Sequence, residues 1–142
     1  MDLIERFVAT APTVARDRVA VLVERAPDYV AELRASVRAH VAESRSHVAA
    51  GSTDVDVALA EAIASTLDGL LALDADHAIP ERRIVTAAVA YFVDVSEADP
   101  DFGSADGLVD DAEVVIAAAT VLGHEALAAP VRTALAGRTS AG

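Results

Sequence analysis

Four carboxylates in the C-terminal half of the chain have the residue types that a site for a hard cation needs. They are Glu97, Asp101, Asp110 and Asp111. The first two lie in the acid-rich segment Asp94–Gly107, and the last two lie at the start of the helix expected after it. If the helices on either side of this segment pack as a hairpin, the four side chains converge at one end. Oxygen ligands gathered in this way could hold Mg²⁺ or Ca²⁺.

The same acids also have a structural interpretation that needs no cation. Asp110 and Asp111 are expected in the first turn of a helix, where acids complement the helix dipole. Asp106 can accept hydrogen bonds from the free backbone N–H groups of that turn, and Asp101 can close an Asx turn after Pro100. We expect the structural role, with the metal site as the alternative.

Other residues that could do chemistry are scattered. His40, Glu43 and His47 have the spacing of metal ligands on one helix face, although a solvated polar face explains them better. His77 is expected in a loop without a neighbouring nucleophile, and His124 lacks the second histidine of a zincin motif. The sequence contains no glycine-rich phosphate loop and no cysteine. We therefore assign no catalytic residue and no cofactor, and expect a protein that is not an enzyme.

The charge balance limits the partners. The chain of 142 residues has 23 acids against 11 basic residues, all of them arginine, and a net charge of −12. This charge argues against nucleic acid and anionic lipid as ligands, because such a binder must neutralise phosphates. A salt-rich cytoplasm would favour a dense carboxylate surface, whereas a GC-rich genome accounts for arginine in place of lysine.

Hydrophobic patterning predicts helices throughout. Apolar residues recur at helical spacing. No stretch in which apolar and polar residues alternate is flanked by hairpin turns, as β-strands would be. The expected helices are Leu3–Arg25 with a break or kink at Pro12, one from Pro27 to Gly51, one around Leu59–Leu71, one from Pro80, Leu108–Leu122 and Pro130–Ala136. Ser52, Thr53 or Asp54 is expected to cap the third of these helices.

The elements form a single all-α domain, a compact bundle of about five or six helices over residues 1–142. Residues 84–122 form an antiparallel helical hairpin within it, and residues 137–142 are expected to be a frayed tail. The uncharged stretches Ile84–Val93 and Val114–His124 are each about half the length that spans a bilayer. Their apolar faces must therefore be covered by the helices before Ala75 or by a second chain.

The hairpin carries a recognisable signature, which consists of an aromatic pair, a Pro-Asp-Phe loop, a glycine and a paired aspartate. These features are Tyr91-Phe92, Pro100-Asp101-Phe102, Gly107 and Asp110-Asp111. In this order and spacing they resemble the YkvA-like family, a small bacterial and archaeal domain of unknown function. The resemblance covers residues 84–122.

The loop departs from the family pattern at several places. Val95 and Ser104 stand where the family has prolines, Glu97 stands at its first loop aspartate, and Ala98-Asp99 replaces an apolar pair. The acidic framework of the family loop is therefore retained, while its apolar surface has become polar. If the family loop contacts a membrane or a partner, this chain should do so less well.

The predicted function is that of a cytoplasmic, YkvA-like protein that acts through protein interaction by its helical hairpin. The partner is either an unidentified protein or a second copy of the chain, and nucleic acid and membrane are not expected. One alternative is a protein or enzyme that binds a divalent metal through the acidic loop. The other is a membrane-peripheral accessory protein whose hairpin lies at the interface.

Overall fold

The chain folds into an all-α bundle, as predicted. The computed structural model describes residues 2–51, 56–93 and 107–141, which contain helices and no strand. The α-helices are α1 (Leu3–Thr10), α2 (Arg16–Leu22), α3 (Val30–Ala49), α4 (Val57–Ala72), α5 (Ile79–Val93), α6 (Gly107–Val121) and α7 (Ala129–Ala141). The short 3-10 turns are η1 (Thr13–Ala15), η2 (Asp74–Asp76) and η3 (Glu125–Ala128).

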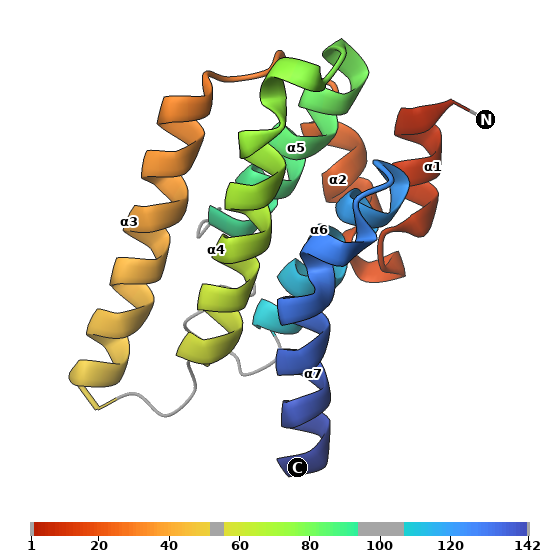
Figure 1. Cartoon of the computed structure of the whole chain (residues 1–142). Helices are drawn as coiled ribbons and strands as arrows, with labels where there is room; N and C mark the ends of the chain where they lie inside the picture. Colours follow the sequence, from red (N-terminus) through yellow and green to blue (C-terminus); the bar gives the residue numbers. More distant parts are fainter. Residues whose placement is uncertain (1, 52–55, 94–106, 142) are drawn as a thin grey trace.

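The helices are arranged around α5 and α6 (Figure 1). Helices α3, α4 and α7 lie side by side, with α4 in contact with both of its neighbours. Behind them, α5 packs against α1, α2, α3, α4 and α6. The N-terminal helices α1 and α2 cover the far side of α5 and α6.

The apolar faces of α5 and α6 form the centre of the core. Their buried apolar residues are Ile84, Val85, Ala87, Ala88, Val89, Phe92, Leu108, Ala112, Val114, Val115, Ala117, Ala118, Ala119 and Val121. Alanine is frequent in this set, and its small side chain leaves room for neighbouring helices. The expectation that protein covers these faces is confirmed, because helices α1 to α4, all before Ala75, pack against them.

Pro12 splits the first expected helix in two. Helix α1 ends at Thr10, and α2 begins only at Arg16 after the turn η1. The break leaves carbonyl groups at the end of α1 without helical partners. The side chain of Arg16 satisfies two of them, because Nε donates to Ala11 O at 3.1 Å and Nη2 donates to Ala9 O at 3.0 Å.

Several helix boundaries differ from the prediction. Helix α3 begins at Val30 instead of Pro27, because the fixed φ of proline suits an extended segment as well as a helix start. Asp56 caps α4 by accepting from Leu59 N at 2.9 Å, whereas the expected caps at 52–54 lie outside the described residues. Helix α7 continues to Ala141, beyond the expected end at Ala136.

Two glycines end helices as predicted. Gly51 has a φ of 102° after α3, and Gly123 has a φ of 80° after α6. Both values fall in the left-handed region that side chains disfavour.

A close contact joins α4 to the turn η3. The hydroxyl of Thr66 donates to Leu127 O at 2.7 Å, across a long separation in sequence. One turn further along α4, a Cβ on Gly69 would lie 3.1 Å from Cδ2 of Leu127. Gly69 therefore lets the η3 turn approach the α4 backbone closely enough for Thr66 to form its hydrogen bond.

Candidate functional site

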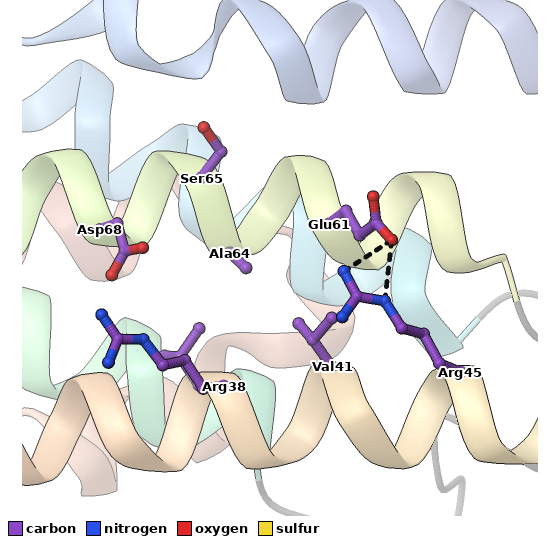
Figure 2. Close-up of a pocket in the computed structure, with 8 residues that line it drawn as sticks. Arg38, Val41, Arg45, Glu61, Ala64, Ser65 and Asp68 are labelled. Carbon is purple, nitrogen blue, oxygen red and sulfur yellow. Dashed lines mark hydrogen bonds and ion pairs between the residues drawn. The ribbon is translucent and has the colours of Figure 1, made fainter.

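A groove lies between α3 and α4. It has a volume of about 370 Å³ and is lined by Val37, Arg38, Val41, Arg45, Glu61, Ala64, Ser65 and Asp68. Figure 2 shows Val41 and Ala64 pointing into the space between the two helices, while Ser65 points away from α3. The groove therefore has an apolar floor and charged rims.

An ion pair with two hydrogen bonds bridges one end of the groove. Arg45 reaches from α3 to Glu61 on α4, with Nε at 3.1 Å and Nη2 at 3.0 Å from the same Oε1 (Figure 2). Both side chains are substantially exposed, so the pair adds little to stability. The pair marks the positions at which α3 and α4 lie opposite each other at this end.

At the other end, two arginines face one carboxylate. Because α3 and α4 run antiparallel, the register that places Arg45 opposite Glu61 also places Arg38, one heptad earlier, opposite Asp68 (Figure 2). Asp68 Oδ1 lies instead 3.9 Å from Nε of Arg34, one turn away from Arg38. No hydrogen bond within the described residues reaches Asp68 Oδ1 or Arg34 Nε, although both atoms are buried.

Arg38 is consequently the surplus cation of the groove. Arg34 and Arg45 each form an ion pair with an α4 carboxylate, and Arg38 forms none with the described residues. Its guanidinium is exposed at the rim, beside the apolar floor. The arrangement can bind one further carboxylate or phosphate group.

The groove is not acidic even though the chain is. The described α-helices carry ten acids and ten arginines, so the net charge of −12 comes from the remaining 13 acids and one arginine. Helix α3 has three arginines, at positions 34, 38 and 45, against two glutamates, Glu32 and Glu43. An anionic group approaching α3 therefore meets a locally positive rim.

The acids of the proposed metal site are only partly within the described residues. Glu97 and Asp101 lie outside them. Asp110 is in the first turn of α6, as expected, whereas Asp111 lies beyond that turn and is 2% exposed. The prediction that both aspartates lie in the first turn is therefore wrong for Asp111, whose helix begins at Gly107 and turns it toward the core.

The interpretation of His40 as part of a solvated polar face is wrong. His40 is 3% exposed, and its ring lies edge-on to Phe92 with ring centres 4.6 Å apart. Glu43 is exposed, so these two residues do not share a face, and the His47 side chain is outside the described part. The spacing held a signal for this position, because His40 comes seven residues after Leu33 and three after Val37, which are both buried.

Two other histidines, expected to be unrelated, lie together. His77 follows η2 and His124 precedes η3, and their ring centres are 5.8 Å apart. The groove arginines were likewise not predicted to face the carboxylates of α4. The equal seven-residue spacings of Arg38 to Arg45 and of Glu61 to Asp68 were the signal that could have paired them.

Comparison with known proteins finds no family model, no curated protein and no solved structure that matches the chain. The resemblance to the YkvA-like family therefore stays a prediction. Within the described ranges, no helix combines the length and the apolar character needed to cross a membrane.

Proposed function

We propose that this protein is a binding module that docks an acidic amphipathic helix of a partner protein in the groove between α3 and α4. The observation that carries the proposal is Arg38, a guanidinium on the groove rim without an ion pair to the described residues. A carboxylate of the partner would form an ion pair with this guanidinium. Arginine suits this role because its planar donors match a carboxylate.

The floor of the groove indicates which other side chains the partner helix should carry and how long that helix should be. Val37, Val41 and Ala64 line it, so an aliphatic side chain can be buried beside the carboxylate. The groove extends from Glu61 to Asp68, a separation of seven positions, which is about 10 Å of helix. Two turns of a partner helix fill that length, with an aliphatic residue and an acid three or four positions apart.

Peptide titration tests the proposal. The probe is a stapled helical peptide with leucine and glutamate four residues apart. Its binding to the full chain is followed by ¹H–¹⁵N NMR. We expect shift changes at Val37, Arg38, Val41 and Ala64. The Arg38→Glu variant should bind at least about tenfold more weakly, because a charge-assisted hydrogen bond contributes roughly 1.5–3 kcal/mol.

The matched control is Arg132→Glu on α7, which changes the net charge equally and leaves the groove intact. It should bind the peptide like the parent chain. A peptide with lysine in place of glutamate should not bind. Equal binding of the lysine peptide, or equal weakening by both variants, would contradict the proposal. Concentration-dependent dimers that Arg38→Glu abolishes would identify a second copy of the chain as the occupant.

The remaining expectations fit this proposal. The expectation of a YkvA-like, non-enzymatic protein that acts through protein interaction is compatible with a docking surface. We place that surface at the α3–α4 groove instead of the hairpin, because other helices cover the apolar faces of the hairpin. We place the protein in the cytoplasm. Recovery of the native protein mainly in the membrane pellet after a high-salt wash would favour the membrane-peripheral alternative instead.

A further inference from the structure

Two turns far apart in sequence bring a pair of imidazole rings together. His77 lies between η2 and α5, and His124 lies between α6 and η3. Their ring centres are 5.8 Å apart, and the ring planes are tilted by 39°. Neither the α3–α4 groove nor the core uses this pair.

His77 is a buried ring with an unused nitrogen. It is 7% exposed, and its Nε2 is buried without a hydrogen-bond partner in the described residues. A buried polar atom of this kind is unfavourable unless something binds it. His124 is half-buried, so the pair can be reached by solvent from the side of His124.

We propose that His77 and His124 bind a Zn²⁺ ion. Imidazole nitrogen is a preferred zinc ligand, and two imidazoles on one tetrahedral ion have ring centres about 5 Å apart, given Zn–N bonds of 2.0–2.1 Å. The observed separation is slightly larger, so the turns need to close by less than 1 Å.

Two ligands come from the described residues, within which no group of three histidines or acids is placed to hold a metal. Water can fill the remaining positions of the ion. Asp76 and Glu125 are the sequence neighbours of the two histidines, and their negative charge attracts a cation to these turns. Zinc bound here links η2 to the α6–η3 turn and stabilises the folded chain.

Zinc titration of the untagged full chain tests the site. We expect one Zn²⁺ per chain by calorimetry, a rise in the melting temperature, and NMR shifts of the imidazole nitrogens of His77 and His124. Mg²⁺ in tenfold excess should not displace the zinc, because Mg²⁺ prefers oxygen ligands.

His77→Gln and His124→Gln should each weaken zinc binding at least tenfold, whereas His47→Gln should leave it unchanged. Since His77 is buried and its variant could fail to fold, the half-buried His124 provides the decisive variant. Zinc affinity retained in His124→Gln, displacement of zinc by Mg²⁺, or no binding at millimolar zinc would each overturn the proposal.

Discussion

At the scale of single residues, the Thr66 hydroxyl is a link between elements. It donates to Leu127 O at 2.7 Å and joins the middle of α4 to the turn before α7. We expect Thr66→Val to lower the free energy of unfolding by about 1–3 kcal/mol, because the carbonyl of Leu127 loses its partner. Urea denaturation followed by circular dichroism measures the change.

Ser44→Ala is the control for this substitution. Ser44 is also buried, but its hydroxyl donates to His40 O at 3.1 Å within α3 and joins no second element. Its loss should change stability by less than the loss of the Thr66 hydroxyl. Equal effects of the two substitutions would show that the contact across elements contributes nothing beyond a local hydrogen bond.

The acids of residues 94–113 give a second prediction at this scale. We expect the purified protein to contain no stoichiometric Mg²⁺ or Ca²⁺, because Asp110 at the start of α6 is placed to complement the helix dipole. Elemental analysis after dialysis measures the metal content. One equivalent of either metal, lost in Asp101→Ala, would replace the structural interpretation with the metal site.

For single residues, the sequence predicted local roles, such as ending a helix, better than it predicted contacts between residues that are distant in sequence. It identified Gly51 and Gly123 as helix ends. It could not place His77 beside His124. Those positions depend on which helices pack together, and periodicity within one helix does not contain that information.

At the scale of helices, caps differ in what they stabilise. Asp56 accepts from Leu59 N at the start of α4, and Asp2 accepts from Glu5 N at 2.8 Å at the start of α1. Helix α4 contacts α3, α5, α6 and α7, whereas α1 is the terminal helix. The same type of cap should therefore matter more in α4.

We expect Asp56→Ala to lower the free energy of global unfolding by about 0.5–2 kcal/mol. Asp2→Ala should act mainly on α1, which can open locally without unfolding the bundle. Native-state hydrogen exchange distinguishes the two, because only Asp56→Ala should speed exchange throughout the core. Increased exchange confined to α4 would contradict this expectation.

Helix existence was predictable and helix boundaries were not. The apolar stripe of α4 and the proline break at Pro12 are local signals, and both appear in the structure. The start of α3 and the length of α7 depend on weaker preferences. Proline at position 27 suits two backbone conformations, and α7, which packs against α4, extends past Gly137.

At the scale of the whole molecule, excess negative charge should make stability depend on salt. We expect the melting temperature to rise between dilute buffer and 1 M KCl, because screening weakens repulsion among the acids. Neutralising the five acids of residues 94–106 should reduce that rise. An unchanged melting temperature from dilute buffer to 1 M KCl would exclude adaptation to a salt-rich cytoplasm.

The separation of charge between helices and connections also bears on how this protein can change over generations. The α-helices taken together are balanced in charge, and of the acids outside them Asp2 and Asp56 cap helices α1 and α4. Substitutions at the other acids of the connections can therefore alter solubility and the isoelectric point, while the caps and the core positions stay under a separate constraint. A lineage moving between environments of different salinity could retune this molecule by drift in its connections alone, leaving the bundle and its arginine-rimmed groove as they are.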